Sequence, residues 1–167
     1  MSTFAERLSM AESERKWDLR YLHLARHISL WSKDPSTKVG AVIVRPDRTV
    51  AALGYNGFPR GCSDDARLYN DRETKLSRVV HAEMNAILSA REPLHGHTIY
   101  VWPPSYGPTC DRCAAHIIQA GIGRVVGVKE TMSELSERWK AACQEALKLY
   151  EEAGITVAMY AESDVYE

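Results

Sequence analysis

A histidine, a glutamate and two cysteines form the pattern in this sequence with the clearest chemistry. His81-Ala82-Glu83 opens an apolar run with helical spacing, and Cys110-Asp111-Arg112-Cys113 opens a later run of the same kind. One imidazole and two thiolates supply three of the four ligands of a tetrahedral zinc ion, which leaves one position open for water. An open position is typical of a catalytic zinc site rather than a structural one.

Each half of this pattern also permits another interpretation. A C-x-x-C pair alone is typical of a redox pair as well as of a metal site, but His81 at a second helix start favours the metal. Glu83 could itself bind the ion, yet it lies two positions from His81, about 200° around a helix, so the two side chains point apart. We therefore expect Glu83 to be a non-ligand that acts as general base and then as general acid.

The composition indicates one globular domain over residues 1–167. The chain is 45% hydrophobic and 26% charged, and its formal net charge is −1. The near-neutral charge predicts no binding of long nucleic acid, whereas a single nucleotide needs only a few well-placed donors. No apolar run is long enough to cross a membrane, and the N-terminus lacks the apolar core of a signal peptide. We therefore expect a cytoplasmic protein with reduced cysteines.

Hydrophobic periodicity predicts an alternation of helices and strands. We expect helices over Trp17–Trp31, Val80–Arg91, Cys110–Ala120 and Leu135–Ala153, and strands over Val39–Val44, Thr49–Leu53, Thr98–Val101, Arg124–Val128 and Ile155–Met159. In the last of these helices Trp139 belongs to the apolar stripe that is expected to face the core. The order α-β-β-α-β-α-β-α-β predicts an α/β layer structure in which a hairpin is followed by parallel strands, so the sheet is mixed. Residues 1–13 show no clear periodicity and are expected to form a loosely held arm.

This arrangement places the two metal motifs at the starts of consecutive helices that can face each other on one side of the sheet. A long segment without periodicity separates them from the hairpin. Gly54–Gly61 is glycine-rich, and it leads into the polar stretch Cys62–Lys75. A loop of this length is uncommon in a compact domain and is more often functional than decorative.

Longer stretches resemble the cytidine deaminase superfamily and, within it, the deoxycytidylate (dCMP) deaminases. The resemblance runs from about Tyr21 to Val128 and is carried by Ser32–Ala41 (SKDPSTKVGA), Gly54–Asp65 (GYNGFPRGCSDD), His81–Ile87 (HAEMNAI), Cys110–Cys113 (CDRC) and Ile117–Ile122 (IIQAGI). The H-x-E and C-x-x-C motifs are shared by zinc-dependent nucleobase deaminases in general. The glycine-rich segment with its acidic end is what points to dCMP.

The resemblance implies a three-layer α/β/α sandwich around a mixed five-stranded sheet. It also implies hydrolysis of dCMP to dUMP and ammonia, which would supply dUMP for thymidylate synthesis. Zn2+ would be held by His81, Cys110 and Cys113, and Glu83 would carry a proton from the zinc-bound water to the pyrimidine ring and then to the leaving amine. Asn56 corresponds to the asparagine that holds the sugar, although Tyr-Asn-Gly is also ordinary turn chemistry.

Other substrate contacts are predicted from residue type and position. Ser32, Lys38 and Arg78 are candidates for binding the phosphate. Tyr106, together with Trp102, is a candidate wall of the pyrimidine pocket, so both cytosine and a 5-substituted cytosine remain open as the base.

The resemblance further implies regulation and assembly. In several members of the family dCTP raises activity and dTTP lowers it, at a separate site in a homo-oligomer that is a hexamer. The residues that match the stretch associated with that site are Gly57, Arg60, Gly61, Asp64 and Asp65. Backbone amides of a glycine-rich loop suit phosphates, whereas the two aspartates would repel a triphosphate unless Mg2+ intervened. The alternative is a structural loop that shapes the substrate pocket.

Two alternative functions remain. The first is a related deaminase acting on dCTP, 5-methyl-dCMP or an adenosine in transfer RNA, of which the RNA substrate is disfavoured by the absence of a basic stripe. The second is a non-catalytic binding module stabilised by zinc, which would need a fourth protein ligand, and Cys62 is the available candidate. The chain also departs from the family pattern, because Thr109 stands directly before Cys110 where the family usually has proline.

Overall fold

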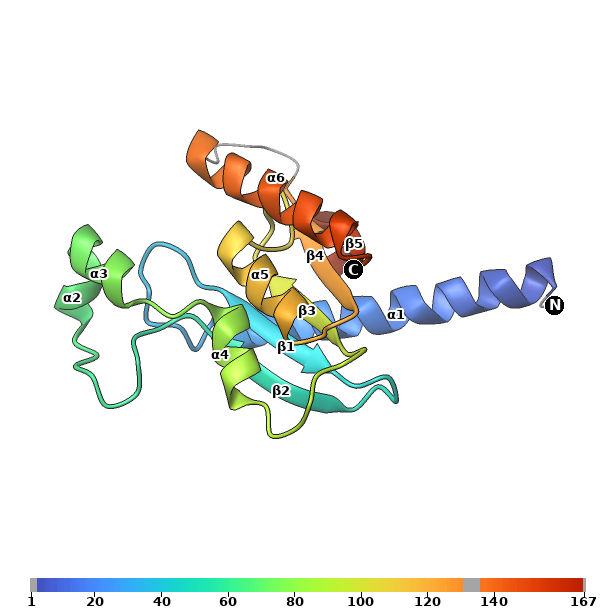
Figure 1. Ribbon diagram of the computed structural model, residues 1–167, viewed down its shortest axis with the longest axis horizontal. Helices are drawn as coiled ribbons and strands as arrows, with labels where there is room; N and C mark the ends of the chain where they lie inside the picture. The colour runs from blue at the N-terminus through green and yellow to red at the C-terminus, as the bar shows by residue number, and fades with distance from the viewer. Residues whose placement is uncertain (1–2, 131–135, 167) are drawn as a thin grey trace.

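The computed structural model describes residues 3–130 and 136–166, which form an α/β fold (Figure 1). Its helices are α1 (Phe4–Ser29), α2 (Ala66–Asn70), α3 (Arg72–Arg78), α4 (Ala82–Ser89), α5 (Asp111–Gln119), α6 (Glu137–Glu152) and α7 (Glu162–Tyr166). Its strands are β1 (Gly40–Val44), β2 (Val50–Tyr55), β3 (Thr98–Trp102), β4 (Arg124–Lys129) and β5 (Thr156–Ala161). The predicted order is confirmed, with the short helices α2, α3 and α7 added. Leu135, the predicted start of α6, lies outside the described residues.

The strands form one mixed sheet in the order β2-β1-β3-β4-β5. β1 pairs antiparallel with both of its neighbours, β2 and β3. β3, β4 and β5 pair in parallel. The predicted hairpin, the parallel pairing of the later strands and the mixed sheet are therefore confirmed.

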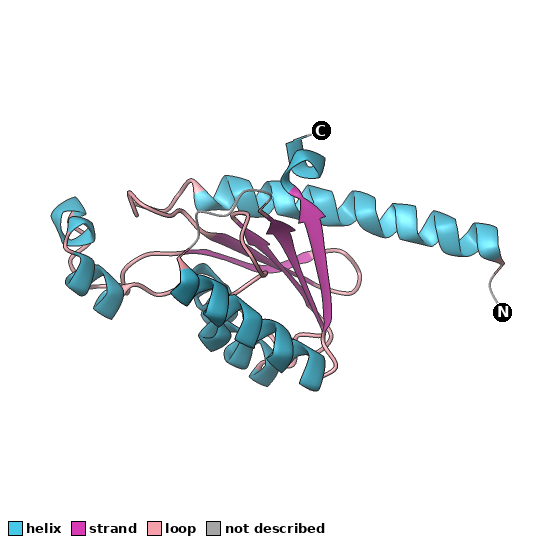
Figure 2. Ribbon diagram, turned by 90° about the horizontal axis from the view of Figure 1, so that it is seen from above, coloured by secondary structure: helices cyan, strands magenta, loops and turns pink. Residues whose placement is uncertain are grey.

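Helices cover both faces of the sheet, which confirms the three-layer α/β/α arrangement (Figure 2). α1 lies on one face, and α4, α5 and α6 lie on the other. Successive strand residues point to opposite faces, so each strand contributes to two cores. Ile99 and Val125 pack in the core beneath α4–α6. Their neighbours Tyr100 and Val126 pack in the core beneath α1.

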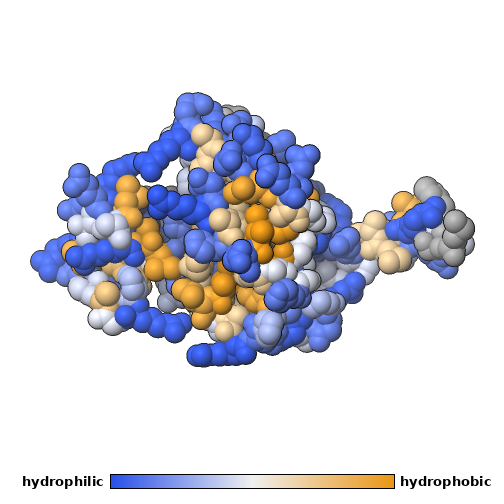
Figure 3. Space-filling model, in the orientation of Figure 1, coloured by the Kyte–Doolittle hydropathy of each residue, from blue (hydrophilic) through white to orange (hydrophobic). Residues whose placement is uncertain are grey.

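α1 begins at Phe4, so the predicted start at Trp17 is wrong and residues 4–13 are helical. Thr3 and Glu6 form a capping box, in which Thr3 Oγ1 accepts from Glu6 N at 3.2 Å and Glu6 Oε2 accepts from Thr3 N at 2.6 Å. The N-terminal end of α1 stands clear of the body of the molecule (Figure 1, Figure 3). Although α1 has 26 residues, neither it nor any other described helix is apolar enough to cross a membrane.

The polar segment after β2 is more ordered than its composition predicts. It contains α2 and α3, which stand beside the main body (Figure 1). Each of these helices begins at an aspartate that caps it: Asp65 Oδ1 accepts from Arg67 N at 2.9 Å, and Asp71 Oδ1 accepts from Thr74 N at 3.1 Å. Such caps satisfy backbone N–H groups that a short helix leaves unpaired. The predicted long loop over Cys62–Lys75 is therefore wrong.

Two glycines let the segments that carry the metal motifs lie close against the sheet. A Cβ at Gly54 in β2 would lie 2.4 Å from a backbone nitrogen of α4. A Cβ at Gly127 in β4 would lie 2.9 Å from the Cα of Pro108, in the loop that leads to α5. A side chain at either position would clash with that backbone, so glycine permits the close approach.

Candidate active site

His81, Cys110 and Cys113 come together at the starts of α4 and α5. His81 and Cys110 are the N-cap residues of these helices, and Cys113 lies in the first turn of α5. His81 Nδ1 lies 3.6 Å from Cys110 Sγ and 3.3 Å from Cys113 Sγ. The three ligand atoms lie within 4.8 Å of one another, and no fourth His, Cys, Asp or Glu among the described residues joins the group. One ion could therefore contact all three predicted ligands, which we call the metal group.

The donors and spacing of the metal group suit zinc. With Zn–N and Zn–S bonds of about 2.1 and 2.3 Å, tetrahedral geometry separates a nitrogen ligand from a sulfur ligand by about 3.6 Å. Both thiols are buried and share a hydrogen bond, which lowers the pKa of Cys110 to about 4 and raises the pKa of Cys113. A bound cation replaces the shared proton, because metal ligation requires thiolates. Cys62, the candidate fourth ligand, is exposed and outside the group.

Glu83 lies in the first turn of α4 and is 4% exposed. Burial is the main cause that raises the pKa of its carboxyl group above the ordinary value. Its carboxylate is outside the metal group and lines the cleft beside it. A buried carboxyl group next to an open metal position can accept and return a proton there.

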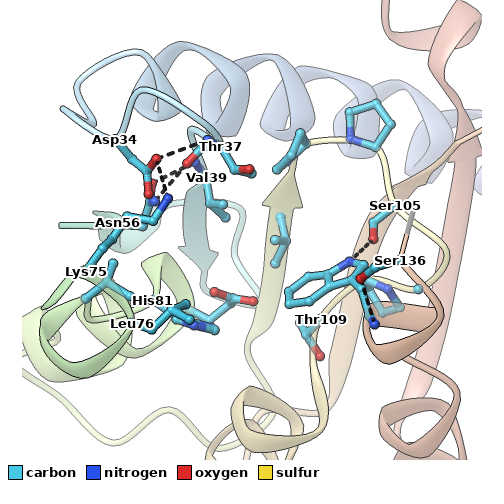
Figure 4. Close-up of a pocket in the computed structure, with 18 residues that line it drawn as sticks. Asp34, Thr37, Val39, Asn56, Lys75, Leu76, His81, Ser105, Thr109 and Ser136 are labelled. Atoms are coloured by element: carbon cyan, nitrogen blue, oxygen red, sulfur yellow. Dashed lines mark hydrogen bonds and ion pairs between the residues drawn. The ribbon is translucent and has the colours of Figure 1, made fainter. Parts of the chain in front are cut away.

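A cleft of about 390 Å³ adjoins the metal group and includes His81 and Glu83 in its lining (Figure 4). This volume lies in the range of small-molecule sites. Figure 4 shows polar residues at two ends of the cleft. The Lys75 end consists of Asp34, Thr37, Asn56 and Lys75, and the Trp139 end consists of Ser105, Ser136 and Trp139. Apolar residues complete the lining, among them Val39, Leu76, Val79, Val101, Pro103, Pro104 and Pro108.

Asn56 holds the backbone at the Lys75 end. Its Oδ1 accepts from Val39 N at 2.8 Å, and its Nδ2 donates to Thr37 O at 2.9 Å. The residue is 5% exposed and lines the cleft. An asparagine amide has two N–H donors, and the bond to Thr37 uses one of them. The side chain is thus compatible both with a structural role and with a substrate contact.

Lys75 and Asp34 line the cleft although neither was predicted as a site residue. Lys75 Nζ lies 3.2 Å from Asp34 Oδ1 and 3.2 Å from Ser36 Oγ. The side chains of Lys75 and Asp34 are 16% and 5% exposed. Asp34 had a local signal, since Asp-Pro-Ser-Thr is a common turn sequence. Lys75 had no such signal. It reaches the cleft from α3, whose polar sequence has no hydrophobic periodicity that would predict a helix.

Two tryptophans occupy positions that differ from those predicted from the sequence. Trp139, predicted as a core residue of α6, is 37% exposed, and its Nε1 donates to Ser105 Oγ at 2.9 Å. Trp102, predicted as a wall of the pocket, packs on the opposite face of the sheet toward α1. Thr109, the departure from the family pattern, forms a buried hydrogen bond of 2.7 Å with the Tyr150 hydroxyl. That bond ties the loop before α5 to α6.

Four residues predicted to contact the substrate do not line the cleft. Ser32 is buried, and its Oγ donates to Asn56 O at 2.8 Å. Lys38 donates to the backbone carbonyl of Ser32. Arg78 is exposed at the end of α3, and Tyr106 is 43% exposed. The structure therefore assigns Ser32 and Lys38 to the support of the Asn56 loop.

The residues predicted for an effector site also lie outside the lining of the cleft, in the segment between β2 and α2: Gly57, Arg60, Gly61, Asp64 and Asp65. Both carboxylates have partners within the chain. Asp64 accepts from the Tyr69 hydroxyl at 2.8 Å and lies 2.5 Å from Lys33 Nζ. Asp65 caps α2 and pairs with Arg67 at 2.7 Å. These cations offset part of the repulsion toward a phosphate, and the effector role stays a prediction.

Residues 15–129 match the family described as the cytidine and deoxycytidylate deaminase zinc-binding region. The match includes both metal motifs and most of the cleft. The chain therefore belongs to this family, and the resemblance noted in the sequence is confirmed.

Individual relatives are consistent with this membership. A protein of Aliivibrio fischeri named "Uncharacterized deaminase in luxG 3'region" is 43% identical over 142 residues, which cover 85% of this chain and 92% of the relative. The deoxycytidylate deaminase of Mus musculus is 35% identical over 147 residues, which cover 84% of this chain and 78% of the relative. The solved dCMP deaminase of the cyanophage S-TIM5 in complex with dCMP and dUMP has a TM-score of 0.62 at 23% identity, over 84% of this chain and 93% of the other. That structure confirms the fold.

Proposed function

We propose that this protein is a zinc-dependent deaminase that hydrolyses dCMP to dUMP and ammonia. The observation that carries the proposal is the metal group with the buried Glu83 beside it in the lining of a small-molecule cleft. Family membership supports zinc and deamination. Relatives named deoxycytidylate deaminase support dCMP as the substrate. The supply of dUMP for thymidylate synthesis follows from this proposed activity and stays a prediction.

In this proposal His81, Cys110 and Cys113 hold the zinc ion. The helix N-terminus of α5 favours the thiolate forms of the two cysteines. When bound, zinc supplies Lewis acidity that lets a water molecule lose a proton near neutral pH.

Glu83 moves two protons in turn. It first takes a proton from the water and passes it to N3 of the cytosine ring, while the water oxygen forms a bond to C4. It then carries the remaining proton of that oxygen to the exocyclic amine, the C4–N4 bond breaks, and ammonia leaves. One water is consumed, and uracil with N3–H and C4=O remains. Burial of Glu83 keeps the carboxyl group away from bulk water, so its protons go to the substrate.

Asn56 is proposed to contact the deoxyribose. Its amide is held by the backbone of Val39 and Thr37, and its second N–H donor is not used by those bonds. A donor that is fixed before the substrate binds costs little conformational entropy on binding.

Ammonia release from dCMP, dCTP, 5-methyl-dCMP and deoxycytidine tests the proposal. We expect dCMP to have the highest kcat/KM of the four. A preference for dCTP or 5-methyl-dCMP would make the protein a related deaminase. Absence of turnover with all four by the zinc-loaded protein would favour the binding-module alternative and overturn the proposal.

Regulation by nucleotides and assembly into a hexamer stay predictions, and both can be tested with the purified protein. Adding dCTP with Mg2+ is expected to raise the turnover of dCMP, and dTTP is expected to lower it. The solution mass of the protein tests the expected hexamer.

A further inference from the structure

The charges that line the cleft are few. Among the described lining residues Lys75 is the only lysine or arginine, and the carboxyl groups are those of Asp34 and Glu83. A phosphate monoester carries about two negative charges at neutral pH. Glu83 has the same sign as the phosphate when ionised, so a nucleotide gains nothing from that side of the cleft. Lys75 is the group in the lining that can offset the charge of a phosphate.

The Lys75 ammonium is held in place and still has bonding capacity. Within the described residues its partners are Asp34 Oδ1 and Ser36 Oγ, each at 3.2 Å, the long end of hydrogen-bond distances. A lysine ammonium has three N–H donors, so these two contacts leave one for a ligand. The side chain is 16% exposed, which means that most of its conformational freedom is already lost before a ligand arrives.

Asp34 joins Lys75 to the rest of this end of the cleft. Its Oδ1 also accepts from Ser36 N at 2.8 Å and from Thr37 N at 3.2 Å, and the residue is 4% exposed. Thr37 O in turn accepts from Asn56 Nδ2. Lys75 and Asn56 are thus fixed to the same short loop, at the same end of the cleft (Figure 4).

We propose that Lys75, positioned by Asp34, binds the 5′-phosphate of the substrate and makes the cleft selective for nucleoside monophosphates over nucleosides. The proposal rests on the proposed function, because it takes the base to lie beside Glu83 and the sugar beside Asn56. A nucleotide in that orientation directs its 5′ substituent along the Lys75 end. Lys75 replaces Lys38 and Arg78, which do not line the cleft, as the phosphate-binding cation.

The Trp139 end offers a rival position, the N-terminus of α6. Ser136 and Trp139 line the cleft there, but no lysine or arginine among the described lining residues accompanies them. Their polar groups are also engaged within the chain, since Ser136 Oγ accepts from Trp139 N at 3.4 Å and Trp139 Nε1 donates to Ser105 Oγ. A neutral helix terminus is the weaker partner for a doubly charged group.

The test compares the Lys75→Met variant with the wild type, both loaded with zinc, on dCMP and on deoxycytidine. We expect kcat/KM for dCMP to fall about 100-fold, mainly through KM, since one partner of a largely buried charge pair is removed. Deoxycytidine lacks the phosphate, so its kcat/KM stays within about threefold of the wild type. Lys75→Arg keeps the charge and is expected to retain most of the preference for dCMP. Arg72→Met, an exposed position on the same helix outside the lining, is the matched control.

Lys75→Met also leaves the Asp34 carboxylate without its cation, which can weaken folding. The double variant Asp34→Asn/Lys75→Met removes both charges and is expected to show the same selective loss. Calorimetric binding of dUMP against deoxyuridine gives a readout that does not depend on turnover. We expect both Lys75→Met and the double variant to lose affinity for dUMP and to keep that for deoxyuridine.

Three outcomes would overturn the proposal. They are an equal loss for dCMP and deoxycytidine, an unchanged kcat/KM for dCMP in Lys75→Met, and a selective loss of dCMP activity in Ser136→Ala instead. A wild-type protein that deaminates none of the nucleotides would instead refute the proposed function. If the wild type prefers dCMP and the Lys75→Met variant keeps that preference, the role of Lys75 is refuted while the proposed function stands.

Discussion

The metal group and the Lys75 end of the cleft face the same space but are built in different ways. The metal group consists of the N-cap residues of α4 and α5 and one residue of the first turn of α5, and these helices lie together on one face of the sheet. The Lys75 end combines the loop after α1, the end of β2 and the helix α3, joined by hydrogen bonds through Asp34 and Asn56. The proposed chemical step therefore relies on residues at two helix starts, whereas the proposed recognition of the nucleotide relies on contacts between distant segments.

Substitutions in the two regions are expected to have different effects. A change in the metal group or at Glu83 should affect every substrate alike, because it acts on the reacting atoms. A change at the Lys75 end should affect binding and stability, and a change of Lys75 itself should separate dCMP from deoxycytidine.

The largest effect is expected from Cys113→Ser. The variant lacks one of three ligands, so we expect it to lose zinc and, with it, turnover of dCMP and deoxycytidine to background. Elemental analysis and ammonia release measure the two quantities. Cys62→Ser, at an exposed thiol outside the metal group, is the control and should keep both. Retention of about one zinc ion per chain by Cys113→Ser would show that the ligand assignment is wrong.

Glu83→Gln is expected to lower kcat by about 10⁴-fold for both substrates while zinc stays bound, since glutamine has the same shape but cannot carry a proton. Steady-state kinetics and elemental analysis of one preparation check this prediction. Glu145→Gln, an exposed change on α6, serves as the control. Near-normal turnover by Glu83→Gln would exclude the proton-transfer role.

Asn56→Ala is expected to have a smaller and different effect. The backbone N–H of Val39 loses its acceptor and Thr37 O loses its donor, so the free energy of unfolding should fall by about 2–4 kcal/mol. We expect kcat/KM to fall about tenfold for dCMP and deoxycytidine together, because the sugar is common to both. Urea unfolding and kinetics provide the measurements, with the exposed Asn70→Ala as the control. If stability did not change, the hydrogen bonds of Asn56 would not hold the loop as described.

Much of the fold was predictable because its signals are local. Apolar spacing located the strands and the longer helices, and the positions of His81 and Cys110 indicated two helix starts. Other local signals were present but overlooked. Thr3 and Glu6 form a capping box at the start of α1, and Asp65 and Asp71 cap α2 and α3. α2, α3 and the N-terminal part of α1 are polar and show no hydrophobic period, so periodicity alone does not detect them.

Lys75 could not be identified as a residue of the cleft from local sequence signals. Lys75 and Arg78 are both cations on α3, and the sequence contains nothing that ranks one above the other. Only the packing of α3 beside Asp34 brings Lys75 into the cleft and leaves Arg78 exposed. In the same way, the helical stripe placed Trp139 in the core, whereas the position of α6 puts it in the lining of the cleft.

The sequence by itself indicated the three residues of the metal group, the order of helices and strands, and Glu83 as a carboxyl group beside that group. Each of the two motifs spans only a few positions, and the geometry of a helix start converts such spacing into proximity. The packing of α4 and α5 on the sheet then brings His81 to the two cysteines. The tertiary structure decided which polar residues share the cleft with Glu83. That outcome depends on how the segments around Asp34, Asn56 and Lys75 pack, and contacts between distant segments leave no periodic trace in the chain.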